Sequence, residues 1–134
     1  MRVVVLGCGR VGALVAGRLC RRHSVTVIDW NPASFARLPD DYAGGTLVCN
    51  GIDAECLREA GAAGADVFLA LTDGDNRNLM AGQIAKQLGA RRVVARVYDA
   101  ERSRIFAEMG LNTVSPTILG AERLFQMAVG EGGQ

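Results

Sequence analysis

The residues best placed for chemistry in this chain are three glycines that follow a short apolar run. Gly7, Gly9 and Gly12 come directly after Val3-Val4-Val5-Leu6, a pattern typical of a buried strand, and a segment with helical periodicity follows them. In this spacing the first glycine allows a tight turn, the second lets a diphosphate approach the backbone, and the third lets the helix pack on the sheet. The helix N-terminus supplies N–H groups and a positive dipole end. The segment therefore predicts a nucleotide-binding loop.

A second apolar run, Val25-Thr26-Val27-Ile28, ends at Asp29. An aspartate at this distance from the glycines can accept hydrogen bonds from both hydroxyls of a ribose, whereas a 2′-phosphate would meet its negative charge. We therefore expect Asp29 to bind an adenosine ribose and to disfavour ligands of the NADP type. The alternative is that Asp29 caps a short helix that contains Pro32.

Two arginines are candidates for contacts with phosphate. Arg10 opens the helix after the glycine loop, where a cation opposes the helix dipole unless an anion is bound nearby. The alternative is that Arg10 is simply solvated. Arg96 closes an otherwise apolar strand and needs an anionic partner, either a ligand phosphate or a carboxylate such as Asp99.

Two further polar segments follow predicted strands. In Asn50-Gly51-Ile52-Asp53 the glycine suits a turn beside a base or ribose, and Asp53 is either an N-cap, which we favour, or a ligand contact. Thr72-Asp73-Gly74-Asp75-Asn76-Arg77-Asn78 combines a turn glycine with more hydrogen-bonding groups than helix capping alone requires.

Composition excludes several function classes. A length of 134 residues fits one domain, and a net charge of +1 with 5% aromatic residues gives no indication of nucleic-acid binding. No apolar run reaches the roughly 18 residues of a membrane span, so we expect a cytoplasmic protein without direct membrane insertion. The four cysteines lack a C-x-x-C spacing and there is one histidine, so we expect no metal site and four reduced thiols. Cys8 is the exception, because a helix N-terminus lowers the pKa of a thiol.

Strands and helices must alternate along the chain to position these groups. Apolar runs predict strands at 2–6, 25–29, 46–49, 66–71, 92–97 and 112–115, and helical periodicity predicts helices at 10–22, 32–38, 53–61, 76–88, 99–109 and 117–129. Strands that are apolar at consecutive positions are typical of a parallel sheet covered on both faces. We therefore predict an α/β fold, a Rossmann-like doubly wound sheet of six parallel strands in the order 3-2-1-4-5-6 with helices on both faces. The polar segments then meet where the first and fourth strands part.

Together these motifs resemble one family, the TrkA N-terminal domain, also called the KTN domain or RCK N-lobe. The resemblance covers residues 1 to about 129 and is carried by Gly7-Cys8-Gly9-Arg10-Val11-Gly12, Asp29, Asn50-Gly51, Asp53, Ala70-Leu71-Thr72-Asp73, Asp75, Asn78-Leu79, Ala95-Arg96-Val97, Gly110-Leu111 and Val114-Ser115-Pro116. Dehydrogenases of the Rossmann type share the glycine loop but not the later segments together.

The resemblance implies regulation rather than catalysis. Members of that family bind NAD(H), ATP, ADP or AMP, pair as dimers, and assemble into rings that gate a membrane potassium channel or transporter. This implies a cytoplasmic location at the inner face of the membrane, with no catalytic residues. The implied nucleotide site comprises Gly7, Cys8, Gly9, Arg10, Val11, Gly12, Asp29, Trp30, Asn50, Gly51, Asp53, Thr72, Asp73, Asn78 and Arg96.

The resemblance also implies a division of the chain. Residues 1–116 correspond to the nucleotide-binding lobe, 117–129 to a crossover helix that packs on a partner subunit, and 130–134 to a flexible tail. The alternative is that 117–129 is a simple core helix. One motif departs from the family pattern, since Gly51-Ile52-Asp53-Ala54 stands where Gly-Asp-Ala-Thr is usual, which displaces the carboxylate by one position. Many members carry a C-terminal effector lobe after this helix, and three alternatives stay open: a lobe that acts alone, a piece of a longer protein, or a subunit that a partner completes. The choice between NAD(H) and an adenine nucleotide also stays open.

The rival hypothesis is a small NAD-dependent oxidoreductase, or a dissociated cofactor-binding domain of one. The chain has no Ser-x-x-x-Tyr-x-x-x-Lys arrangement, and its only lysine, Lys86, lies on a predicted helix with a surface pattern. A regulator is therefore the favoured interpretation.

Overall fold

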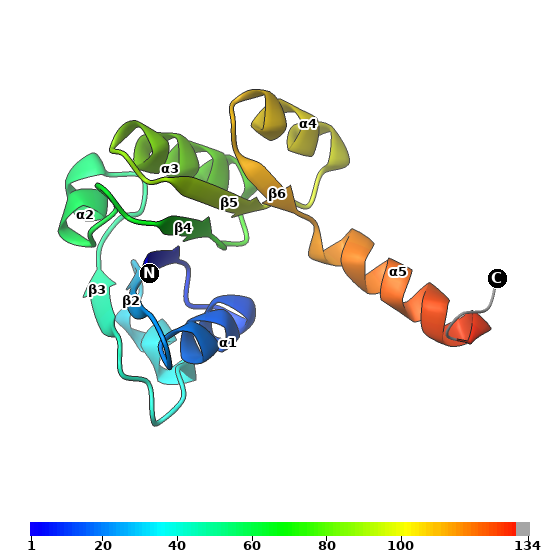
Figure 1. The fold of residues 1–134 in the computed structure, drawn as a ribbon, viewed down its shortest axis with the longest axis horizontal. Coiled ribbons are helices and arrows are strands. Elements are labelled where there is room, and N and C mark those ends of the chain that lie inside the picture. The colour runs from blue at the N-terminus through cyan, green and yellow to red at the C-terminus, as the bar shows by residue number, and fades with distance from the viewer. Residues whose placement is uncertain (131–134) are drawn as a thin grey trace.

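The computed structural model describes residues 1–130 and shows the predicted doubly wound sheet (Figure 1). Its six strands are β1 (Arg2–Leu6), β2 (Ser24–Asp29), β3 (Gly45–Val48), β4 (Val67–Ala70), β5 (Arg92–Arg96) and β6 (Asn112–Val114). They pair in parallel in the order β3-β2-β1-β4-β5-β6. The predicted fold class and strand order are thus confirmed.

The helices are α1 (Arg10–Leu19), the 3₁₀ helix η1 (Pro32–Arg37), α2 (Ala54–Glu59), α3 (Asp75–Gln87), α4 (Ala100–Glu108) and α5 (Pro116–Val129). Each lies where helical periodicity predicts it. The largest difference is at the end of α1, which stops at Leu19 rather than at residue 22. The N–H groups of Arg22 and His23 both donate to the Leu19 carbonyl, so the last turn closes there and the chain enters β2 at Ser24.

Two apolar clusters cover the two faces of the sheet. One joins alternate residues of the central strands, such as Val4 and Phe68, to α2, α3 and α4. The other joins the intervening residues, such as Val3 and Val5, to α1 and the η1 segment. Because successive side chains of a strand point to opposite faces, a continuous apolar run such as Val3-Val4-Val5-Leu6 serves both clusters.

The last helix, α5, differs from all the others. It leaves the sheet after β6 and extends away from the body of the molecule (Figure 1), and none of its residues is buried. The alternative that it is a core helix is therefore wrong, because no strand or helix of the described chain covers it. The predicted flexible tail lies outside the described residues except for Gly130.

None of the helices in residues 1–130 is long and apolar enough to cross a membrane.

Candidate nucleotide-binding site

Two adjoining cavities open at the carboxyl ends of the neighbouring central strands β2, β1 and β4. A cavity of about 340 Å³ is lined by Leu6, Gly7, Asp29, Trp30, Asn50, Gly51, Ile52, Thr72 and Arg77. A second, of about 250 Å³, is lined by Gly7, Cys8, Gly9, Arg10, Asp29, Trp30, Asn31, Ser34, Arg37, Leu71, Thr72, Asp73, Arg77 and Arg96. This is the place where doubly wound sheets bind nucleotides.

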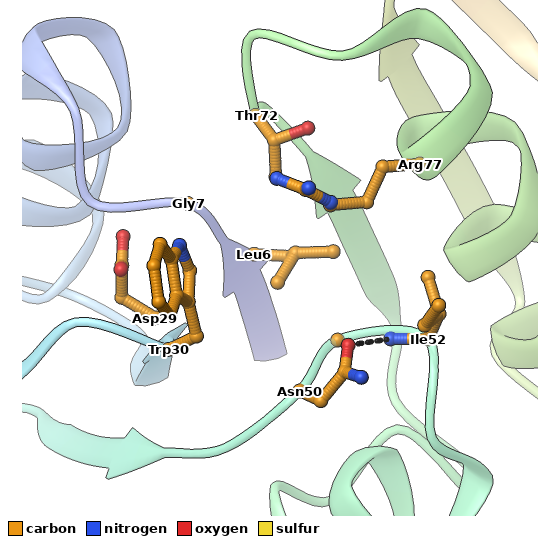
Figure 2. A pocket seen from close by; sticks show the side chains of 9 residues that line it. Leu6, Gly7, Asp29, Trp30, Asn50, Ile52, Thr72 and Arg77 are labelled. Atoms are coloured by element: carbon orange, nitrogen blue, oxygen red, sulfur yellow. Dashed lines mark hydrogen bonds between the residues drawn. The ribbon is translucent and has the colours of Figure 1, made fainter.

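Figure 2 shows how the first cavity is enclosed. Leu6 points into its centre from β1, and Trp30 stands beside Asp29 on one side. Arg77 reaches in from α3 beside Thr72, and the loop carrying Asn50 and Ile52 forms the opposite wall. The cavity combines apolar walls with a few polar groups, as sites for drug-sized ligands do. We call it the nucleoside cavity, after the part of a nucleotide that the sequence leads us to expect here.

The glycine loop has the geometry that the motif requires. Gly7 has φ +103°, and a Cβ there would lie 3.0 Å from the backbone N of Thr72. A Cβ on Gly12 would lie 1.9 Å from the carbonyl oxygen of Gly7, so any side chain would push α1 off the sheet. Gly9 differs, because a Cβ there would meet no described protein atom within 4 Å. Gly9 therefore leaves space in front of the N-terminus of α1, where the backbone N–H groups have no partners within the helix.

Asp29 lies between the two cavities and holds the glycine loop in place. Its Oδ2 accepts a hydrogen bond from the Cys8 N–H at 2.8 Å, and its Oδ1 accepts one from the Asn31 N–H at 2.9 Å. An ionised carboxylate has about four acceptor sites, so capacity for ribose hydroxyls remains. The alternative role of Asp29 as a helix cap is wrong, because the Asn31 side chain caps η1 by accepting from the Ala33 N–H at 3.1 Å.

Four arginines line the second cavity against two carboxylates, Asp29 and Asp73. The arginines are Arg10, Arg37, Arg77 and Arg96. We call this the arginine cavity. Because the two carboxylates balance only half of this charge, the cavity has an electrostatic preference for an anion.

Arg96 is held in place by two contacts. Its Nε donates to the Thr72 carbonyl at 3.2 Å, and its guanidinium lies 5.3 Å from the ring centroid of Tyr98. The alternative that Asp99 neutralises Arg96 is wrong. Asp99 instead caps α4 by accepting from the Glu101 N–H and pairs with Arg102 at 3.5 Å.

The polar segment after β4 divides into residues that face the cavities and one that supports them. Thr72 lines both cavities and Asp73 lines the arginine cavity. Asn78 is 0% exposed and lines neither. Its side chain accepts from the N–H and Oγ1 of Thr72 and donates to the carbonyls of Thr72 and Arg96. Asn78 therefore joins the loop after β4 to the end of β5, and the prediction that it lines the pocket is corrected.

The loop after β3 likewise contains residues that line a cavity and one that does not. Asn50, Gly51 and Ile52 line the nucleoside cavity. Asp53 lies outside both cavities, and its Oδ1 accepts from the Glu55 N–H at 3.0 Å as the N-cap of α2. The favoured interpretation of Asp53 as a cap is confirmed.

Eleven of the predicted site residues line the cavities, and Val11, Gly12, Asp53 and Asn78 line neither. Sequence reasoning named the segment that contains Arg77 without assigning this arginine to the site, and it missed Arg37. Arg77 lies inside the polar segment after β4 and could have been found there, because that segment follows a strand at the open edge. Arg37 carries no such signal, since it reaches the site only through the fold of η1, from which its Nη1 donates to the Cys8 carbonyl at 3.4 Å.

The cysteines contradict two predictions. Cys49 and Cys56 form a disulfide, so the expectation of four reduced thiols is wrong, because the turn between β3 and α2 brings two cysteines together that no motif marks as a pair. Cys8 is buried, and its pKa is raised rather than lowered, first by burial and then by the charge of Asp29. Within the part of the chain that the structure describes, no cluster of His, Cys, Asp and Glu could hold a metal ion.

The family model of the TrkA-N domain matches residues 3–116, which is most of the chain. This chain belongs to the TrkA-N domain family. A curated relative, the Trk system potassium uptake protein TrkA of Streptomyces coelicolor, is 36% identical over 136 aligned residues. The alignment covers all of this chain and 61% of that protein, so the chain spans about three fifths of its relative's length.

Solved structures share the fold at low sequence identity. The AMP-bound form of the Kef CTD of Shewanella denitrificans superimposes with a TM-score of 0.80 at 22% identity, covering 96% of this chain and 79% of the other. The GsuK channel bound to NAD superimposes with a TM-score of 0.72 at 19% identity, covering 86% of this chain and 21% of that one. At these identities the likeness shows only that the three proteins share a fold.

Proposed function

We propose that this TrkA-N domain is a nucleotide-operated regulatory unit of a potassium channel or transporter. The observation that carries the proposal is the pairing of a nucleoside cavity with an arginine cavity, with Asp29 between them. A nucleotide has the matching parts, namely an apolar base, a ribose with two hydroxyls, and phosphates. All of this chain aligns with part of the potassium uptake protein TrkA of S. coelicolor. This match supports the choice of a cation transporter as partner.

The ligand we propose is NAD(H) or one of the adenine nucleotides ATP, ADP and AMP. Asp29 serves the adenosine ribose that all of them share, and the glycine loop with Arg10 and Arg96 serves their phosphates. The AMP-bound and NAD-bound relatives of the same fold support this class of ligand. Asp29 would repel a 2′-phosphate, so NADPH binds more weakly than NADH.

Regulation requires that the ligand favours one of two arrangements of the assembly. A ligand shifts such an equilibrium only by its difference in affinity for the two states. Arg77 and Arg10 suit this role, because both line the arginine cavity and the side chain of neither has a hydrogen-bond or ion-pair partner among residues 1–130. They can follow the number of phosphates present, since an added phosphate charge gains charge-assisted hydrogen bonds.

We further propose that the chain acts in the cytoplasm as a homodimer, and in a higher ring assembly, through α5. Leu124 and Phe125 are 69% and 57% exposed, and Ile118, Leu119, Met127 and Val129 are exposed with them. Large apolar side chains gathered on an uncovered helix are typical of a protein interface. A second copy presents the same helix, so a symmetric contact would cover both.

Ligand titration tests the proposed binding directly. Trp30 is the only tryptophan, lines both cavities and is 73% exposed, so its fluorescence should change when either cavity fills. AMP, ADP, ATP, NAD, NADH and NADPH are titrated by fluorescence and calorimetry against the parent and the variant Arg10→Ala. Arg91→Ala is the matched control, because Arg91 is an exposed arginine that lines neither cavity.

Potassium flux tests the regulatory role. In membranes that contain the cognate pore, flux with the parent should respond to nucleotide, and the response should be lost with Arg10→Ala and kept with Arg91→Ala. Identical flux under every nucleotide condition contradicts the proposal. Steady hydride turnover from NADH by the isolated chain favours the oxidoreductase alternative instead.

A further inference from the structure

The loop that borders the nucleoside cavity is closed by the disulfide between Cys49 and Cys56. Cys49 follows β3 directly, Cys56 lies in α2, and their Cα atoms are 5.9 Å apart, within the usual range for disulfides. The four residues that follow Cys49 make the turn from the sheet into α2, and three of them, Asn50, Gly51 and Ile52, line the cavity. The covalent link therefore closes a short ring that includes part of the cavity wall.

Hydrogen bonds within this ring, and one from the ring to β2, connect the disulfide to the site. The Cys49 N–H donates to the carbonyl of Asp29 at 3.3 Å, so the first cysteine is bonded to the residue that serves the ribose. The Asn50 side chain accepts from the Ile52 N–H at 3.1 Å, and the Asp53 N–H donates to the Asn50 carbonyl at 3.0 Å. A shift of this turn would therefore move both the cavity wall and the backbone of Asp29.

We propose that Cys49 and Cys56 are a reversible redox-modification site that sets the nucleotide affinity of the adjoining cavity. The inference rests on the proposed nucleotide binding and adds a second input to it. In the proposed cytoplasmic location, disulfides are rare, and those that occur are usually transient and serve catalysis or redox sensing. The placement of this one at a ligand cavity fits sensing.

The chemistry is thiol–disulfide exchange with a low-molecular-weight or protein dithiol. A thiolate of the dithiol attacks the sulfur of Cys49, which is partly exposed, and Cys56 leaves as a thiolate that takes up a proton. The second thiol of the reductant loses its proton and attacks the mixed disulfide, which releases Cys49. The protein disulfide gains two electrons and becomes two thiols, and the dithiol becomes a disulfide. A disulfide oxidant reverses the sequence.

The disulfide state should bind nucleotide more tightly. With the link intact the turn is held in the conformation that lines the cavity, so less ordering is required when the ligand binds. After reduction the turn keeps its hydrogen bonds but loses its covalent closure. We expect reduction to weaken the binding of AMP and NAD about three- to tenfold. The cost of ordering one or two side chains on binding changes a dissociation constant by about this factor.

The test compares oxidised and reduced protein directly. The full chain is equilibrated in mixtures of reduced and oxidised dithiothreitol of graded redox poise, alkylated and mapped by mass spectrometry. Trp30 fluorescence gives the affinities for AMP and NAD in each state. We expect a linked peptide containing Cys49 and Cys56, and weaker binding as that link is lost. The variant Cys49→Ser with Cys56→Ala should bind as the reduced parent does and should not respond to the buffer.

Cys20→Ala is the matched control, because Cys20 is a free cysteine that lines neither cavity. It should keep the full redox response. Absence of the link in oxidising buffer, or equal affinity in the two states, overturns the inference and leaves the proposed function standing. Binding of neither ligand in either state refutes the proposed function, and the inference with it.

Discussion

The helices α1 and α5 differ in how they pack against the rest of the chain. The helix α1 buries Gly12, Ala13 and Ala16 against the sheet and presents its N-terminus to the cavities, whereas α5 is longer and buries nothing. Small residues let α1 approach the strands closely, and close approach fixes the position of the glycine loop. The large apolar residues of α5 have no such surface within the described chain. The comparison shows that a helix can be fully formed locally while its packing partner lies outside the fold.

The sheet with its covering helices, residues 1–115, which we call the body, should therefore respond differently to substitution than α5 does.

Gly12→Val should have the largest effect. Its side chain begins 1.9 Å from the Gly7 carbonyl oxygen, a backbone atom that cannot move without shifting the loop. We expect a loss of about 3 kcal/mol in the free energy of unfolding, measured by urea denaturation, together with a loss of nucleotide binding. Gly9→Ala is the control, because its Cβ meets no described atom, and it should lose binding while stability changes by a few tenths of a kcal/mol. Equal losses of stability in both variants would show that the two glycines do not have separate roles.

Asp29→Ala should weaken both stability and binding. The carboxylate accepts from the N–H groups of Cys8 and Asn31. The bond to Asn31 is exposed, so we expect the two charge-assisted hydrogen bonds together to contribute about 1.5–3 kcal/mol at most. We expect the melting temperature to fall and the affinity for NADH to drop, with the preference for NADH over NADPH removed. Calorimetry of the parent that gives equal affinities for NADH and NADPH would refute the ribose assignment.

Tyr42→Phe should change how the stability of the protein depends on pH. Tyr42 packs against the same apolar cluster as α1. The Tyr42 hydroxyl donates to the Gly45 carbonyl at 2.8 Å, and its pKa is raised to about 12, chiefly by burial. Because the pKa of Tyr42 is higher in the folded than in the unfolded chain, its protonated hydroxyl contributes to stability. This contribution is complete below pH 10, near the unfolded pKa, and is lost as the pH rises through 12. We expect the variant to lose about 1 kcal/mol at neutral pH and to show a flatter decline of stability between pH 10 and 12. An unchanged alkaline slope would assign the decline to other groups.

Removal of residues 116–134 should affect the body least. Because α5 buries no residue, the truncated chain should unfold cooperatively and bind AMP as the parent does. Its unfolding midpoint should no longer rise with protein concentration, as that of a dimer does, and light scattering should give a monomer. The double variant Leu124→Asp with Phe125→Asp should reproduce this result in the full chain, and Gln126→Asp should not. A parent that is monomeric at high concentration would remove α5 from the interface.

The sequence alone determined the alternation of elements, the strand order and most of the residues at the open edge of the sheet. The strand order follows from the right-handed crossovers of a doubly wound sheet. The other features rest on short-range rules: the apolar runs of parallel strands, the glycine spacing after Leu6, and N-caps such as Asp53, which accepts from the N–H two residues later. Each of these short-range rules acts over a few residues, so it can be applied to the amino-acid sequence without knowledge of the fold.

Only the tertiary structure decided which distant groups meet. It buried Asn78 between the loop after β4 and the end of β5, brought Arg37 to the glycine loop, joined Cys49 to Cys56, and left α5 uncovered. These outcomes depend on distances between side chains whose backbones are set by the whole sheet, and residue types do not encode such distances locally. The polar residues of a nucleotide site can therefore be predicted from the sequence. Which of them face the ligand and which hold the loops depends on the packing of the whole fold.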